Sequence, residues 1–167
     1  PLASTPEPPT FRVRSLSYSA LALFGRCSYR FYAERIAGLR SAEPGGTGVE
    51  GLAATEIGDA VHVALEEGRV GAETADLVLA RYPAATREDL ERVASLVDAW
   101  HSSPLAEELR SGEEPKPELP FAFEHDGVLL HGRFDLFRLA DGRALVVDYK
   151  TNRLEELTPE EALEDDY

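Results

Sequence analysis

The sequence of 167 residues contains a single cysteine, has few basic residues and lacks any long hydrophobic run. One cysteine excludes an internal disulfide framework and a self-contained four-cysteine zinc or iron–sulfur site. No apolar stretch approaches the roughly 18 residues of a membrane span, and no signal-peptide core follows the proline-rich start. With 43% hydrophobic residues, the chain is long enough to bury a core as one domain. We therefore expect a soluble intracellular domain without a membrane partner.

The charge of the chain is unevenly distributed. Seventeen Lys and Arg stand against 31 Asp and Glu, and the net charge of −14 at first sight disfavours a nucleic-acid partner. Residues 1–40, however, contain six Arg and two Glu, whereas residues 154–167 contain seven acids and no base. A basic opening segment can contact phosphate groups while an acidic tail lies elsewhere. The net charge therefore excludes no class of partner.

Helical patterns dominate the first two thirds of the chain. Ser17 can cap a helix that runs to about Leu39 with a break near Cys27, whose side chain we expect to be small and buried. A glycine-rich loop is expected over 41–53. Further helices are expected over 55–67, 73–82 and 86–102, the last one capped by Thr86.

From Glu118 onward the hydrophobic residues alternate with a period of two, which is typical of strands. Segments 118–125, 128–139 and 143–151 are joined by Asp126-Gly127 and Asp141-Gly142, a pair that favours two-residue hairpin turns. Helices followed by an antiparallel meander predict an α+β fold. We expect one face of this sheet to form the core, with the members Leu119, Phe121, Phe123, Leu130, Phe134, Leu136, Leu145, Val147 and Tyr149.

Three acidic residues fall on the opposite face of the predicted sheet. With two-residue turns, Asp135 lies opposite Glu118 on one side and Asp148 on the other, in one row with about 5 Å between neighbours. Lys150 lies on the same face, opposite Arg133. Oxygen ligands at this spacing suit Mg²⁺ or Mn²⁺, and a nearby ammonium suits a phosphate substrate. The alternative is that these acids are solvated residues of an exposed face.

His62 is a further candidate ligand. It lies in the helix predicted for 55–67, just beside the apolar stripe that includes Ile57 and Val61. This position would turn the imidazole toward the sheet. The alternative is a histidine at the edge of the core with its hydrogen bonds satisfied.

Four stretches of the sequence resemble the PD-(D/E)XK nuclease superfamily, specifically the nuclease domains of bacterial helicase–nucleases of the RecB, AddA and AddB type. The resemblance covers about residues 14–167, and its last two motifs together are fairly specific. In family order, the stretches are the opening segment Leu16–Tyr32, Gly58-Asp59-Ala60-Val61-His62, Gly132-Arg133-Phe134-Asp135 and Val146-Val147-Asp148-Tyr149-Lys150-Thr151.

The resemblance implies an α/β/α, restriction-endonuclease-like core around a mixed sheet, and an exonuclease domain for single-stranded DNA in double-strand break repair. It implies Mg²⁺ or Mn²⁺ held by His62, Asp135, Asp148 and the main-chain carbonyl of Tyr149, with Lys150 as the catalytic lysine. Glu118 is added to the ligands by the strand register alone. Implied partners are DNA and a helicase motor domain, in cis or in trans, in the bacterial cytoplasm. The expected DNA contacts are Arg26, Tyr29, Arg30 and Arg133.

The start of the sequence marks a domain boundary, whereas its C-terminal end and its cysteine depart from the family pattern. The prolines of residues 1–10 predict a linker, so we place the domain boundary after residue 13. A Gln-x-x-x-Tyr helix follows the catalytic strand in the family, and residues 14–167 are expected to lack it. Some relatives carry an iron–sulfur cluster whose first cysteine matches Cys27, but the other three cysteines are missing, so no cluster is expected within this chain. The alternative function is a cleavage-silent module that binds DNA or scaffolds a partner subunit.

Overall fold

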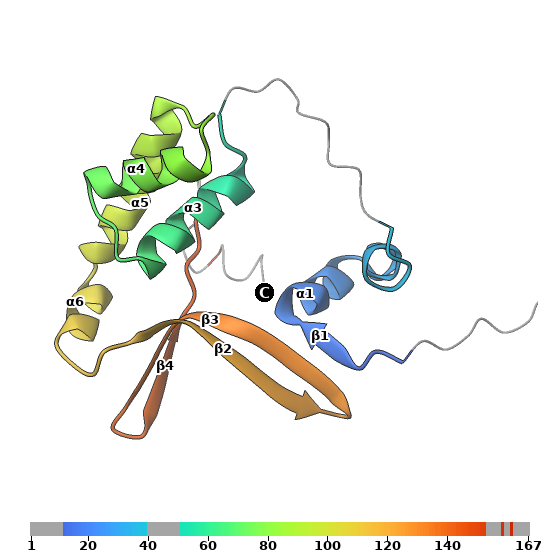
Figure 1. Cartoon of the computed structure of the whole chain (residues 1–167). Coiled ribbons are helices and arrows are strands. Elements are labelled where there is room, and N and C mark those ends of the chain that lie inside the picture. The colour runs from blue at the N-terminus through green and yellow to red at the C-terminus, as the bar shows by residue number, and fades with distance from the viewer. Residues whose placement is uncertain (1–11, 40–50, 153–157, 159–160, 162–167) are drawn as a thin grey trace, which may run out of the picture. The chain divides into compact units, whose positions relative to one another are not determined.

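The structure is a computed structural model that describes residues 12–39, 51–152, 158 and 161. The helices and strands of these residues form an α+β fold, as predicted (Figure 1). Nearly all of the expected linker, most of the expected loop at 41–53 and most of the acidic tail lie outside the described residues. The chain divides into two compact units: Pro1–Thr47 with Pro120–Arg133, and Gly48–Leu119 with Phe134–Tyr167.

The helices of the first unit begin at the cap that the sequence predicts. The elements are β1 (Ser15–Ser17), α1 (Tyr18–Arg26), α2 (Ser28–Phe31) and a π-helical turn, η1 (Tyr32–Ile36). The Ser17 hydroxyl accepts a hydrogen bond from the N–H of Ala20 at 3.2 Å. The predicted break at Cys27 is confirmed, because this residue is extended and its Sγ accepts from the N–H of Arg30 at 3.4 Å. Cys27 is exposed, however, so the expectation of a buried side chain was wrong.

Strand β1 was not predicted. It runs parallel to the beginning of β3 (Val128–Ala140), with Ser15 opposite Leu129 and Ser17 opposite His131. The N–H of Leu129 donates to the carbonyl of Arg14 at 2.9 Å. Three residues are too few to show a period, and their partner lies more than 100 residues later in the sequence.

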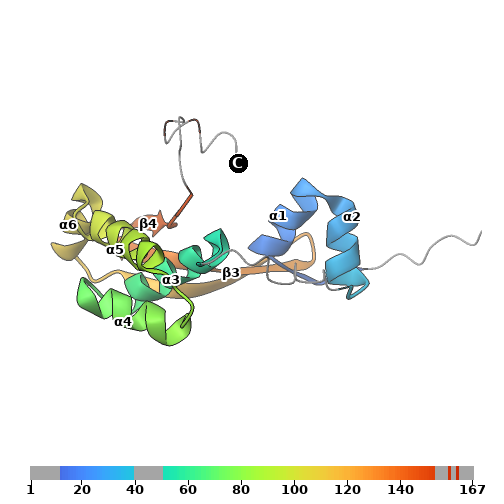
Figure 2. The same cartoon turned by 90° about the horizontal axis from the view of Figure 1, so that it is seen from above.

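The helices of the second unit enclose its core. They are α3 (Ala54–Glu66), α4 (Ala72–Arg81), α5 (Arg87–His101) and α6 (Pro104–Arg110), and the first three lie against one another in Figures 1 and 2. Thr86 caps α5 as predicted, with Asp89 completing the capping box. None of the described helices is long and apolar enough to cross a membrane. The core consists of Ile57, Ala60, Val61, Ala64, Val78, Val93 and Val97.

The hairpin strands are β2 (Lys116–His125), β3 and β4 (Arg143–Val147). Both Asp-Gly pairs have positive φ at each residue, as a two-residue hairpin turn of the predicted type requires. Leu136 pairs with Val147 and Ala140 with Arg143, the predicted register. The sheet is mixed, because β1 is parallel and β4 antiparallel to β3.

The predicted apolar face of the sheet is not the core. Of its nine expected members, Leu136 is buried, whereas Phe123 is 53% exposed and the others are half-buried or exposed. The alternating pattern thus identified the strands correctly but overstated their burial. The helices of the second unit supply most of the buried side chains in the described part of the chain.

Candidate metal centre

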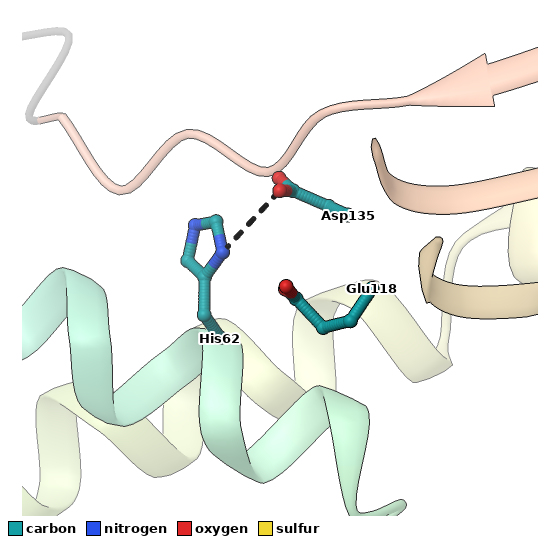
Figure 3. Close-up of side chains that lie close together, drawn as sticks. All are labelled: His62, Glu118 and Asp135. Carbon is teal, nitrogen blue, oxygen red and sulfur yellow. Dashed lines mark ion pairs between the residues drawn. The ribbon is translucent and has the colours of Figure 1, made fainter. Parts of the chain in front are cut away.

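Three predicted site residues come together in the second unit (Figure 3). His62 projects from α3, Glu118 from β2 and Asp135 from β3, and one ligand atom of each lies within 4.8 Å of the others. These residues are separated by up to 73 positions in the sequence and are all half-buried. His62 thus lies beside the carboxylates of Glu118 and Asp135, and its role as a metal ligand stays a prediction.

The local sequence explains how each member reaches this point. His62 follows Val61, which is 3% exposed, and Asp135 precedes Leu136, which is 8% exposed. Each is thus held next to a buried side chain of its own element. Glu118 lies in the Pro-flanked segment Pro117-Glu118-Leu119-Pro120 and has a positive φ of 47°. Such a conformation is uncommon for a residue other than glycine, and it is typical of functional sites.

The hydrogen bonds of His62 fix its tautomer. Its Nε2 lies 3.2 Å from the carbonyl oxygen of Tyr149, which can only accept, so Nε2 carries the proton. In the neutral ring Nδ1 then presents a lone pair, and this atom lies 3.6 Å from Oδ1 of Asp135. A ring protonated on both nitrogens would form an ion pair with this carboxylate, whereas the lone pair of a neutral ring and the carboxylate oxygen can share a metal ion. The arrangement therefore accommodates a cation between the two side chains.

Asp135 also determines where β4 ends. Its Oδ2 accepts a hydrogen bond from the N–H of Tyr149 at 2.6 Å. A backbone donor that would continue the ladder is thus bonded to a side chain, and β4 ends at Val147, short of the predicted residue 151. The predicted row of three carboxylates is accordingly only partly formed: Glu118 and Asp135 belong to the cluster, and Asp148 does not.

Asp148 and Lys150 form an ion pair beside the cluster. The Nζ of Lys150 lies 2.6 Å from Oδ2 of Asp148, and the two side chains are 44% and 54% exposed. The pair holds an ammonium group within reach of solvent, next to the residue whose backbone contacts both His62 and Asp135. Its position suits a phosphate group that enters from solvent.

Tyr149 is packed between two rings. The indole of Trp100 on α5 and the imidazole of His62 each meet it edge to face, with centroids 4.9 Å and 5.7 Å away. Burial, followed by the charges of Asp135 and Glu118, raises the pKa of Tyr149 to about 12. The phenol therefore stays neutral under ordinary conditions. Its carbonyl, which the resemblance makes a metal ligand, accepts from His62.

Arg92, which sequence reasoning missed, and Gly58 of the second motif both contact the segment after Tyr149. Arg92 on α5 donates from Nη2 to the carbonyl of Thr151 at 3.3 Å. A Cβ on Gly58 of α3 would lie 3.3 Å from Oγ1 of Thr151, so glycine allows the helix to approach this closely. A glycine within a helical motif, as at Gly58, indicates a close approach of another segment. Nothing in the sequence around Arg92 indicates its contact with Thr151.

The predicted DNA contacts lie in the first unit and outside the cluster. Tyr29 is 80% exposed, and Arg30 pairs with Glu34 at 2.6 Å, so part of its charge is already balanced. Arg26 is exposed at the end of α1, and Arg133 is exposed on β3. Nothing in these positions opposes contact with a strand.

The spacing of His62 and Asp135 fits a shared divalent metal ion. Two ligand atoms at about 2.1 Å from one ion are about 3.0 Å apart at a right angle and about 4.2 Å apart when opposed. The 3.6 Å between Nδ1 of His62 and Oδ1 of Asp135 lies within this range. An imidazole with two carboxylates is a donor set that can hold a divalent metal ion.

Comparison with known families agrees with this geometry. The family model of the PD-(D/E)XK nuclease superfamily matches residues 15–166. No curated protein is similar enough to the chain to match it. The matched region contains the whole cluster and the Asp148–Lys150 pair.

Proposed function

The chain belongs to the PD-(D/E)XK nuclease superfamily, and on this premise we propose that His62, Glu118 and Asp135 hold the divalent metal ion of a nuclease. The observation that carries the proposal is the meeting of these three donors, from three elements, at one point. A bound Mg²⁺ or Mn²⁺ would lower the pKa of a coordinated water and neutralise charge on the scissile phosphate. The reaction is hydrolysis of a phosphodiester bond.

The other residues of the site prepare it for this reaction. The carbonyl of Tyr149 keeps His62 in the tautomer with Nδ1 toward the carboxylates. Lys150 neutralises a phosphate oxygen or orients the attacking water, and Asp148 orients Lys150 through their ion pair. Asp148, a ligand in the family pattern, is a further candidate ligand of the same ion. The Tyr149 carbonyl, the other ligand in that pattern, instead accepts a hydrogen bond from Nε2 of His62, on the side of the ring away from Nδ1.

We propose single-stranded DNA as the substrate and exonucleolytic cleavage as the activity. The support is the likeness of Gly132–Asp135 and Val146–Thr151 to the motifs of bacterial helicase–nucleases of the RecB, AddA and AddB type. In this proposal the domain works with a helicase motor, in cis or in trans, in the bacterial cytoplasm during double-strand break repair.

The test is a cleavage assay with the full chain. A 5′-labelled linear single strand and a circular single strand are incubated with Mg²⁺, with Mn²⁺ or with excess chelator. We expect shortening of the linear strand only, and only with metal. Asp135→Asn should lower the rate by about 10³-fold or more, because it removes a charged ligand. Asp98→Asn, at an exposed position of α5, should leave the rate unchanged.

A second measurement separates metal binding from turnover. Lys150→Ala should abolish cleavage but retain metal binding in calorimetry, because a cation is not itself a ligand. Cleavage in excess chelator, or equal rates for Asp135→Asn and parent, would exclude the proposed site. The position of Asp148 outside the cluster favours one alternative, a cleavage-silent module that binds DNA. Metal binding without cleavage by the parent would establish that alternative.

A further inference from the structure

A cavity in the first unit is lined by several basic side chains and, among the residues that the structure describes, by no acidic one. It measures about 640 Å³ and lies between β1 and the helices that follow it. Arg12, Arg14 and Arg35 line it together with His131, and the buried side chains of Ala20 and Phe31 contribute to its apolar wall. No function described above uses these four basic residues.

The three arginines of the cavity differ from six others in the chain. Arg30, Arg69, Arg81, Arg87, Arg110 and Arg138 each form an ion pair with a carboxylate. Among the described residues, none of the ion pairs involves Arg12, Arg14 or Arg35. Among the described residues that line the cavity, these three guanidinium groups have no counter-charge, and an anion would supply one.

The cavity is built on paired backbone. The carbonyl of Arg14 accepts from the N–H of Leu129, and β1 pairs in parallel with the strand that carries His131. Ser17, which also lines the cavity, caps α1. The basic groups therefore project from a fixed frame, which lowers the entropy lost when an anion binds.

The surroundings of the cavity favour a strand of nucleic acid over a small anion. The described part of the first unit contains six Arg and three acidic residues, although the whole chain has a net charge of −14. The same segment exposes Tyr18, Phe24, Tyr29 and Tyr32, each more than half exposed. A basic groove with exposed aromatic rings is the usual composition of a single-strand binding surface.

We propose that Arg12, Arg14, Arg35 and His131 form a binding site for the phosphate backbone of single-stranded nucleic acid. The inference rests on the proposed function for the identity of the strand as the nuclease substrate. The binding of phosphate groups by these basic residues does not depend on it. The site recognises phosphodiester groups without reading bases, so its affinity depends on salt and not on sequence. It lies in a different unit from the metal ligands, so binding and cleavage can be lost separately.

The experiment measures binding of the full chain to fluorescein-labelled dT20 by anisotropy in EDTA, over a series of KCl concentrations. Each phosphate contact contributes about 0.7 to the slope of log affinity against log salt. Arg14→Ala/Arg35→Ala should therefore reduce the magnitude of the slope by about 1.4 and weaken binding at least tenfold at low salt. The control is Arg87→Ala/Arg143→Ala, two exposed arginines of the second unit, which should bind like the parent.

Circular dichroism spectra that match the parent establish that both double variants are folded. If Arg14→Ala/Arg35→Ala does not fold, the single variant Arg35→Ala replaces it and should reduce the magnitude of the slope by about 0.7. Equal slopes for the two double variants would overturn the proposal. Displacement of dT20 by 1 mM inorganic phosphate at constant ionic strength would also overturn it, since the site would then suit a small anion. Binding through this cavity without cleavage in Mg²⁺ or Mn²⁺ would contradict the proposed function alone.

Discussion

Glu118 combines a functional position with a strained backbone. Its φ of 47° lies in the left-handed region, where a side chain costs about 1–2 kcal/mol, and its carboxylate lies close to that of Asp135. Backbone strain and the nearby carboxylate of Asp135 both disfavour this arrangement. Strained residues of this kind cluster at functional sites, which is consistent with a role of Glu118 as a ligand.

The strain at Glu118 can be measured with two substitutions. In the metal-free protein we expect Glu118→Gly to be more stable than Glu118→Ala by about 1 kcal/mol, since both remove the charge and only glycine accepts the positive φ. Urea denaturation measures the difference. At Glu124 on the same strand, where φ is not positive, Ala should be more stable than Gly by about 0.5–1 kcal/mol. The same order at both positions would exclude backbone strain at Glu118.

At the scale of the element, the ring of Phe121 on β2 covers Gly132 on β3. A Cβ on Gly132 would lie 2.7 Å from Cζ and 2.9 Å from Cε1 of Phe121. Glycine at this motif position is thus required by packing, because any side chain would displace the ring. The contact joins two strands of the first unit and lies three residues before Asp135 in the sequence.

Replacement of this glycine should destabilise the hairpin. We expect Gly132→Ala to lower the free energy of unfolding by about 1–3 kcal/mol, the usual cost of overpacking. In a Phe121→Leu background the same change should cost about 0.5 kcal/mol or less, so a double-mutant cycle should report strong coupling. Gly25→Ala is the control: no atom lies within 4 Å of its Cβ position on α1, and helix propensity predicts a gain. Additive effects at Gly132 and Phe121 would contradict the packing argument.

Helix α5 and the segment that leads into α3 are joined through one carboxylate. Oδ2 of Asp89 accepts hydrogen bonds from the hydroxyl and the N–H of Thr86, at 2.7 Å and 2.8 Å, and from the N–H of Leu52 at 3.0 Å. Burial raises the pKa of Asp89, but these hydrogen bonds, with the charge of Arg92, outweigh burial and hold the pKa below its ordinary value of 3.8. The unfolded chain therefore takes up this proton at a higher pH than the folded one.

This depressed pKa predicts an acid-sensitive contribution to stability. The carboxylate of Asp89 should contribute fully above about pH 3.8, and its contribution should be lost as the pH falls through the folded-state pKa. Asp89→Asn should cost about 1 kcal/mol at pH 7, and the gap to the parent should narrow below pH 3.8. Urea titrations at pH 7, 5 and 3 measure this gap. A gap that stays constant down to pH 3 would show that the charge is not involved.

Local chemistry was enough to predict most elements. Ser17 and Thr86 marked helix starts, and the two Asp-Gly pairs marked turns whose φ values the structure confirms. Helix α6 was missed although Ser103-Pro104, a cap followed by proline, signalled it. The end of β4 was not predictable, because the N–H of Tyr149 bonds to the carboxylate of Asp135 and no propensity describes such a contact.

At the scale of the whole molecule, all three residues of the metal cluster belong to the second unit, as does Trp100, the one tryptophan of the sequence. Trp100 packs on Tyr149, whose backbone contacts His62 and Asp135. Its fluorescence should therefore report the unfolding of the unit that binds metal. Far-ultraviolet circular dichroism reports the helices of both units.

Metal should stabilise this unit by mass action. At Mg²⁺ concentrations about 100 times the Kd, the gain is about 2.7 kcal/mol, which corresponds to a rise of about 5–15 °C in the Tm followed by Trp100 fluorescence. Asp135→Asn should lose most of the rise, and Asp98→Asn should keep it. An equal rise in the parent and in Asp135→Asn would show that Mg²⁺ binds elsewhere.

Cys27, at the break between α1 and α2, offers an attachment site for a fluorescent dye. Its thiol is exposed in the first unit, and the single tryptophan lies in the second. A dye attached to this thiol can accept excitation energy from the indole without any residue being removed first. The native chain thus carries its own donor and attachment site, and the efficiency of energy transfer would measure in solution how far apart the two units lie, before and after a strand binds.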